Sequence, residues 1–358
     1  MFLELNLLSA LQVVLLGFIG GVLSGFIGSG GAFFMTPGMM NLGVPGVVSV
    51  GSNITHKFGK AMMGSRRHSE MGHVDKKLGF YMLITALIGI RFAVWLNSIT
   101  FKIGGGEHGG GGENGGGGSA AGDLYISSVF VLILSVVSIF ILRDAFKSRE
   151  TGEGPSTKLA EFAARLKLPP IIEFKVADVK ISFWIISLVG LATGYLAGTI
   201  GVGGFIGVPA MIYIFGIPAQ VAAGTELFLA QFMGAWGAIN YAWDGYVDLR
   251  LVLLLYLGSL LGIYIGAYGT KVVKEKMIRV VTGVIILLCV ISRGIAIPVY
   301  LRQLGFIQMN PDFDKYFNLI SKIMLFASGI IGVLVILGAV IQAYRKRRKV
   351  QAMLLVSH

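Results

Sequence analysis

Two glycine-rich motifs, one in each half of the chain, have the spacing to interrupt a membrane helix. The first runs from Gly25 to Gly31 as Gly-Phe-Ile-Gly-Ser-Gly-Gly, and the second from Gly198 to Gly204 as Gly-Thr-Ile-Gly-Val-Gly-Gly. Glycine relaxes the backbone and leaves its N–H groups open to a ligand. A helix that begins after such a break presents free donors and partial positive charge, so each motif predicts an anion site. The alternative is that the glycines only allow close helix packing.

A stripe of polar residues inside a predicted membrane span adds side-chain chemistry. Asn53, Lys57 and Lys60 share one helical face, and the shift that aligns the two glycine motifs places Asn53 on Glu226. Ionisable groups at membrane depth are functional candidates. Either lysine can pair with Glu226, or bind an anion while Glu226 carries a proton. The alternative for each lysine is snorkelling to the interface.

These patterns define the candidate site. We expect substrate to be bound by groups of the glycine motifs and the polar stripe, namely Gly28, Ser29, Gly30, Gly31, Asn53, Thr55, Lys57, Gly201, Gly203, Gly204, Thr225 and Glu226. Coupling or pathway candidates are His56, Lys60, Arg91 and Gln231. For Arg91, a place on an anion path, snorkelling and a structural ion pair all remain open, and His56 has a structural alternative.

Composition places these residues in a membrane. Of the 358 residues, 55% are hydrophobic and 13% charged, against about 25% charged in a soluble domain. Apolar runs long enough to cross a bilayer recur, and they predict spans at 7–28, 46–66, 78–101, 123–142, 181–201, 219–241, 249–270, 277–299 and 317–344. The apolar pieces 32–42 and 205–215 are too short to cross.

The charge pattern indicates topology rather than a nucleic-acid partner. The net charge is +12, and the basic residues cluster in loops beside the spans, which is the positive-inside pattern. Five consecutive basic residues, Arg345–Lys349, put the C-terminus in the cytoplasm of a multi-pass cell (inner) membrane protein. Nucleophile elbow, metal-ligand cluster and P-loop lysine motifs are all missing from the sequence. We therefore expect no enzyme, no cofactor, no metal and no nucleic-acid role.

The two halves of the chain are copies of one unit. A single constant shift in numbering, called the repeat offset, aligns Gly17, Gly21 and Gly25 with Gly190, Gly194 and Gly198, and the register continues to Asp75 and Asp248. The predicted fold is an all-α polytopic membrane protein of two homologous repeats with broken or re-entrant half-helices. The units are a first repeat at 1–146 with a glycine-rich loop at 104–118, a cytoplasmic linker at 147–180, a second repeat at 181–344 and a basic tail at 345–358. The linker is expected to hold an amphipathic helix over Ser156–Leu168.

Loop charges favour opposite orientations for the two repeats. The loop at 66–77 is basic, whereas the corresponding loop at 242–248 carries Asp244 and Asp248. An inverted repeat explains this difference, although nine full spans would leave the C-terminus outside. Half-length helices around the glycine motifs would resolve the conflict.

The sequence resembles the TauE/SafE sulfite exporter family. The resemblance is carried by the doubled glycine motif with its following proline, by Ala223-Gly224-Thr225-Glu226-Leu227, and by Gly245-Tyr246-Val247-Asp248-Leu249-Arg250. It covers both repeats and implies a secondary transporter of sulfite, organosulfonates or related sulfur-containing or carboxylate anions, often an exporter. A coupling proton or sodium ion and an oligomer remain open. The alternatives are a membrane receptor or assembly subunit, and an anion channel.

Overall fold

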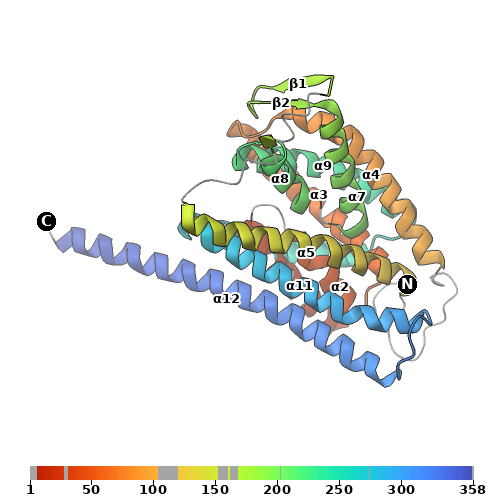
Figure 1. Cartoon of the computed structure of the whole chain (residues 1–358). Helices are drawn as coiled ribbons and strands as arrows, with labels where there is room; N and C mark the ends of the chain where they lie inside the picture. Colours follow the sequence, from red (N-terminus) through yellow and green to blue (C-terminus); the bar gives the residue numbers. More distant parts are fainter. Residues whose placement is uncertain are drawn as a thin grey trace.

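The computed structural model describes residues 6–27, 31–103, 120–151, 160–161, 168–201, 203–273 and 275–356. These residues form a helical bundle with a small β-hairpin at one end (Figure 1). The helices are α1 Leu7–Ile27, α2 Ala32–Asn41, α3 Gly46–Glu70, α4 Lys76–Ile103, α5 Ala120–Thr151, α7 Phe183–Ile200, α8 Gly204–Tyr213, α9 Ala219–Trp243, α10 Leu249–Val272, α11 Glu275–Gln303 and α12 Asp312–Val356. Each predicted span overlaps a long helix, but α5 and α12 end at Thr151 and Val356, well past the predicted ends at 142 and 344. The two short apolar pieces form α2 and α8.

Not all of the long helices are apolar. Within the described ranges, seven are long and apolar enough to cross a membrane, namely α1, α4, α5, α7, α10, α11 and α12. α3 and α9, with 25 residues each, are as long but are not in this set. They pack against each other, and α3 also contacts α2, α4, α5, α7 and α10. The expectation of nine apolar spans thus differs at 46–66 and 219–241, where polar and charged residues such as Lys57, Lys60 and Glu226 lower the hydropathy.

Each short helix folds back along the helix before it. A Cβ at Gly31 would overlap the carbonyl of Gly20, and one at Gly38 would overlap the side chain of Leu16, so α2 runs antiparallel to α1. In the second half, Gly203 lies against Ala197 and Gly207 against Thr193, which gives α8 the same course along α7. The two helix pairs are called hairpin 1 (α1–α2) and hairpin 2 (α7–α8). Both turn at a glycine motif.

Close glycine contacts join each hairpin to a helix of the other half. α1 lies parallel to α10, with Gly17 on Leu255, Gly21 on Ser259 and Gly25 on Ile263. α7 lies parallel to α4 in the same manner, with Gly190 on Met82, Gly194 on Ala86 and Gly198 on Ile90. A Cβ at most of these glycines would overlap backbone atoms of the facing helix, so the packing requires them. The packing alternative therefore accounts for the first glycine of each motif, Gly25 and Gly198.

The contact between α3 and α9 is antiparallel and reciprocal. Gly64 on α3 faces Leu227 on α9, and Gly237 on α9 faces Ile54 on α3. The repeat offset aligns Gly64 with Gly237 and Ile54 with Leu227, so the second contact repeats the first with the two halves exchanged. The loops that follow these helices repeat the exchange with hydrogen bonds. The backbone N–H of Asp75 donates to Thr225 Oγ1 at 3.0 Å, and that of Asp248 donates to Ser52 Oγ at 3.1 Å.

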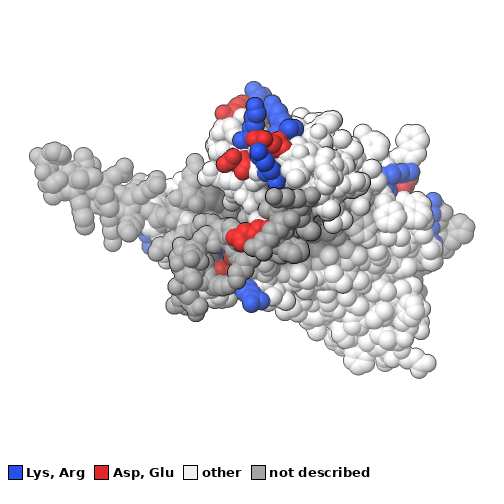
Figure 2. All heavy atoms as spheres, turned by 45° about the horizontal axis from the view of Figure 1, so that its top comes forward, with Lys and Arg blue, Asp and Glu red and all other residues white. Residues whose placement is uncertain are grey.

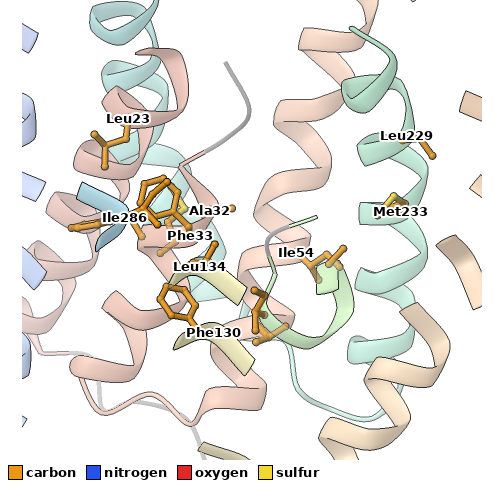
Figure 3. Close-up of a cluster of buried hydrophobic side chains, with 14 of the residues drawn as sticks. Leu23, Ala32, Phe33, Ile54, Phe130, Leu134, Leu229, Met233 and Ile286 are labelled. Atoms are coloured by element: carbon orange, nitrogen blue, oxygen red, sulfur yellow. The ribbon is translucent and has the colours of Figure 1, made fainter. Parts of the chain in front are cut away.

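A continuous apolar core fills the space beneath hairpin 1. Leu23, Ala32 and Phe33 of this hairpin belong to the same buried cluster as Phe130 and Leu134 of α5 and Ile286 of α11 (Figure 3). α12 packs along α11 and α10 and, in Figure 1, extends well beyond the rest of the bundle towards the C-terminus. The basic segment 345–349 continues this helix, which ends at Val356.

The linker between the halves contains a β-hairpin that was not predicted. β1 Ile171–Phe174 pairs antiparallel with β2 Val179–Ser182, and the β-branched and aromatic residues of the two segments suit strands. Asp75 Oδ2 accepts the backbone N–H groups of Val176 and Ala177 at 3.2 and 3.1 Å, which fixes the turn to the loop between α3 and α4. Figure 2 shows lysine, arginine and acidic side chains gathered at this end of the molecule. The amphipathic helix expected over Ser156–Leu168 lies almost wholly outside the described residues.

Candidate functional site

A cavity of about 380 Å³ opens between the two halves. Its walls come from the end of α1, the second half of α3, the first half of α9, the second half of α10 and one residue of α8. Among its lining residues are Ser24, Gly25, Lys57, Lys60, Gly64, His68, Val208, Ala223, Glu226, Leu260, Ile263, Tyr264 and Ala267. The cavity therefore lies beside the contact of α3 with α9, next to the tip of hairpin 1.

The charged residues of the cavity come from both halves. Lys57 and Lys60 project from α3, and Glu226 projects from α9. Lys57 Nζ lies 4.0 Å from Glu226 Oε1, and the two side chains are 12% and 4% exposed. The attraction between such charges is strong in a low-dielectric interior, but it must offset the cost of removing both from water. A separation of 4.0 Å leaves the lysine incompletely paired.

The Glu226 carboxylate has little other support. Neither of its oxygens has a hydrogen-bond partner among the described residues, although both are buried. One oxygen lies so close to Gly207 of α8 that a Cβ there would overlap it. Glu226 thus faces hairpin 2 on one side and Lys57 on the other. A buried carboxylate with unfilled acceptor sites can take a proton or a cation, or can yield its lysine to an incoming anion.

Asn53, at the equivalent position of α3, is engaged in a different way. Its amide Nδ2 donates to the carbonyl of Ala32 at 2.9 Å and to Thr36 Oγ1 at 2.8 Å. The Thr36 hydroxyl in turn donates to the carbonyl of Ile200 at 3.0 Å. These bonds join the start of α2 to the end of α7, so they bring the tips of the two hairpins together beside α3.

The glycines of the two tips serve this close approach. Gly201 has a φ of 76° and ends α7 in the left-handed conformation that favours glycine. A Cβ on Gly201 would lie 2.9 Å from Asn53 Nδ2 and 3.1 Å from Thr36 Oγ1. Gly203 precedes α8, and Gly204 is the buried first residue of that helix. Gly28, Ser29 and Gly30, which join the two helices of hairpin 1, lie outside the described residues.

Three other candidates, Thr55, Thr225 and His56, make contacts away from the cavity. Thr55 Oγ1 donates to the carbonyl of Gly51 in its own helix at 2.7 Å. Thr225 Oγ1 accepts the Asp75 N–H described above. His56 Nε2 lies 2.8 Å from Ser259 Oγ on α10, and its ring packs against Tyr256. None of these three is among the residues that line the cavity.

The last two candidates lie away from the cavity. Arg91 is exposed on the outer surface of α4, where Nη1 donates to Asn240 Oδ1 at 3.0 Å. Gln231 is half-buried on α9. Ser24, Thr36, Asn97 and Tyr241 belong to the site region and were not singled out from the sequence. Asn97 and Thr36 carried a signal, because each is a polar residue inside an apolar stretch.

Comparisons with known proteins agree on the class of protein. A family model described as "Sulfite exporter TauE/SafE" matches residues 13–293. The chain is 23% identical over 233 residues to the "Probable membrane transporter protein YdhB" of Bacillus subtilis (strain 168), which covers 64% of this chain and 78% of the relative. It is 28% identical over 101 residues to the "Probable membrane transporter protein YunE" of the same organism, covering 28% and 37% of the two chains. No solved structure matches at a significant level.

Proposed function

The chain belongs to the sulfite exporter TauE/SafE family of membrane proteins, and from this premise we propose that it is a gradient-driven secondary transporter of a small anion. The observation that carries the proposal is the cavity, which holds Lys57, Lys60 and Glu226 between the two halves. The lysines and the glutamate leave one formal positive charge there. A cationic cavity that reaches membrane depth suits a monovalent anion and repels cations.

The anion in this proposal is sulfite, an organosulfonate or a related sulfur-containing or carboxylate anion. Lys57 binds the anionic head, and Lys60 raises the local positive potential. Glu226 competes with the anion for Lys57, so binding of the anion releases the carboxylate. A proton or a sodium ion then compensates Glu226, which couples the anion to a gradient. Export is the proposed direction.

The proposed architecture is an inverted repeat. Support comes from the antiparallel course of the equivalent helices α3 and α9, and from contacts that recur when every residue is moved by the repeat offset. In this arrangement both hairpins enter the membrane and return to the same side. The full crossings are then α3, α4, α5, α9, α10, α11 and α12, and the basic loops and the C-terminus all lie in the cytoplasm. Rocking of the halves would expose the site to each side in turn.

Flux into proteoliposomes tests the proposal. Purified protein is reconstituted with labelled sulfite, an organosulfonate or a short carboxylate outside, and proton, sodium or anion gradients are imposed one at a time. We expect saturable uptake of at least one anion that depends on a gradient. Flux that never saturates would indicate a channel. If none of the anions moves under any gradient, the transport of small anions is refuted and a receptor or assembly role gains support.

A further inference from the structure

The surface around Arg91 forms a second hollow, on the opposite side of the α3–α9 contact from the cavity. This groove of about 500 Å³ is lined by Leu87, Ile88, Arg91, Phe92 and Trp95 of α4 and by Trp236 of α9. Apart from Arg91, its lining is apolar and aromatic. An arginine that faced lipid permanently at this depth would be costly. The position therefore needs a reason.

The repeat offset relates this groove to the cavity. Leu87 corresponds to Leu260, Arg91 to Tyr264, and Trp236 to Met63. All three counterparts line the cavity. Groove and cavity are thus the same region of the fold, seen once in each half.

The cavity reaches deeper than the groove, because some of the residues that line the cavity have counterparts beneath the groove that are buried. Ile263, Ala267 and Lys60 line the cavity. Their counterparts beneath the groove, Ile90, Val94 and Met233, are 0%, 0% and 1% exposed. Side chains that would continue the groove down to the hairpin tips are therefore packed in the core.

A hydrogen-bonded cluster holds the closed side together. Tyr241 Oη donates to the carbonyl of Gly198 at 2.6 Å. Asn97 Nδ2 lies 2.6 Å from Tyr241 Oη and 3.1 Å from the carbonyl oxygen of Thr199. The cluster joins α4 and α9 to the end of α7, at the tip of hairpin 2. Gly25 and His68, the counterparts of Gly198 and Tyr241, line the open cavity. This hydrogen-bonded cluster, called the Asn97–Tyr241 clamp, therefore lies on the closed side.

We infer that the groove is the closed form of a second entrance to the same site, and that Arg91 is the anion-binding residue of that entrance. The inference rests on the proposed transport function. When the two halves exchange conformations, α4 separates from α9, the Asn97–Tyr241 clamp opens, and Arg91 lines a water-filled path. Asn240 positions the guanidinium in the closed form, because its own amide is held by the carbonyl of Trp236 at 2.8 Å.

Cysteine accessibility tests the entrance. Val94 and its counterpart Ala267 are replaced one at a time by cysteine, in a Cys289→Ala background, and an impermeant anionic methanethiosulfonate is applied to one face of the membrane. Ala267→Cys should react from the face on which the cavity opens. Val94→Cys should react from the opposite face, faster while anion is being transported. Ile90→Cys gives a second position if Val94→Cys fails to fold.

The outcomes separate the inference from the proposed function. If wild-type vesicles transport anion but neither Val94→Cys nor Ile90→Cys reacts from either face, the second entrance is refuted and the transport function stands. If the wild type moves no anion, both fail.

Variants of Arg91 test its role in the entrance. Arg91→Gln should raise the KM for anion about tenfold or more at the face of the groove, as expected for a lost charge-assisted contact, with little change at the other face. Arg91→Lys should restore most of the affinity. Lys315→Gln, which removes an exposed charge near the start of α12, should alter neither KM. An equal effect of Arg91→Gln on both faces would assign the arginine a structural role and overturn this part of the inference.

Discussion

Asn53 on α3 and Glu226 on α9 are related by the repeat offset, so they occupy matching positions of the two halves. The Asn53 amide donates two buried hydrogen bonds and holds the hairpin tips together. The Glu226 carboxylate has no hydrogen-bond partner among the described residues and faces a lysine across the cavity. Asn53 is thus a neutral group whose amide donates structural hydrogen bonds, whereas Glu226 is a charged group without a hydrogen bond among the described residues. At positions related by the repeat offset, such differences separate the residues that hold the fold from those that act on a ligand.

The largest effect is expected at Lys57, whose counterpart in the second half is Ala230. Lys57→Met keeps the length of the side chain and removes its charge, so anion flux in proteoliposomes should fall at least about tenfold, as expected for the loss of a charge-assisted contact. Lys57→Arg should retain part of the flux. The double variant Lys57→Met with Glu226→Gln should be more stable to heat than Lys57→Met alone, because it does not leave the buried Glu226 carboxylate without its partner. Unchanged flux in Lys57→Met would make the lysine a structural residue.

The free energy of unfolding should depend more on Asn53 than on Glu226. Asn53→Ala leaves the Ala32 carbonyl and the Thr36 hydroxyl without their donor, and should lower the free energy of unfolding by about 1–3 kcal/mol. Glu226→Gln alone would leave buried Lys57 without its partner, so it is compared in a Lys57→Met background. There it breaks no hydrogen bond among the described residues and removes a buried charge, and it should leave stability unchanged or raise it. Thermal unfolding in detergent measures both. A larger loss in Glu226→Gln than in Asn53→Ala would reverse the distinction between the two positions.

Much of this fold could be predicted from sequence because hydropathy and the repeat offset are local or linear signals. They located the long helices and the short α2 and α8, and they offered Lys57 or Lys60 as a partner of Glu226. The direction in which a side chain points around its helix depends on which neighbours cover that helix. Arg91 was therefore an open case, and its place on an outer groove required the packing of α4 against α7 and α9. The polar residues of α3 also gave no sign that this helix contacts six other helices of the bundle.

Asp75 and its counterpart Asp248 also have contacts that the sequence could not predict, and one of these holds the unpredicted β-hairpin. Both residues cap the next helix, Asp75 through the Leu78 N–H at 3.0 Å and Asp248 through the Arg250 N–H at 2.9 Å. The second oxygen of Asp248 is bound by the Arg250 side chain at 2.8 Å, whereas that of Asp75 holds the turn of the β-hairpin. A sequence that shows two aligned aspartates cannot reveal that their second partners differ.

The smallest expected effect concerns Asp75 and Asp248. Asp75→Ala removes a cap, which should cost about 0.5–2 kcal/mol of stability, and it releases the β-hairpin, so hydrogen exchange at the amides of 176 and 177 should accelerate. Asp248→Ala should cost a similar amount without changing exchange in the β-hairpin. Lys180→Gln breaks only the exposed pair with Glu173 and should leave exchange at both amides unchanged. Slow exchange at 176 and 177 in Asp75→Ala would mean that other contacts, such as the Lys77 Nζ bond to the Glu173 carbonyl at 3.0 Å, suffice to hold the β-hairpin on the loop between α3 and α4.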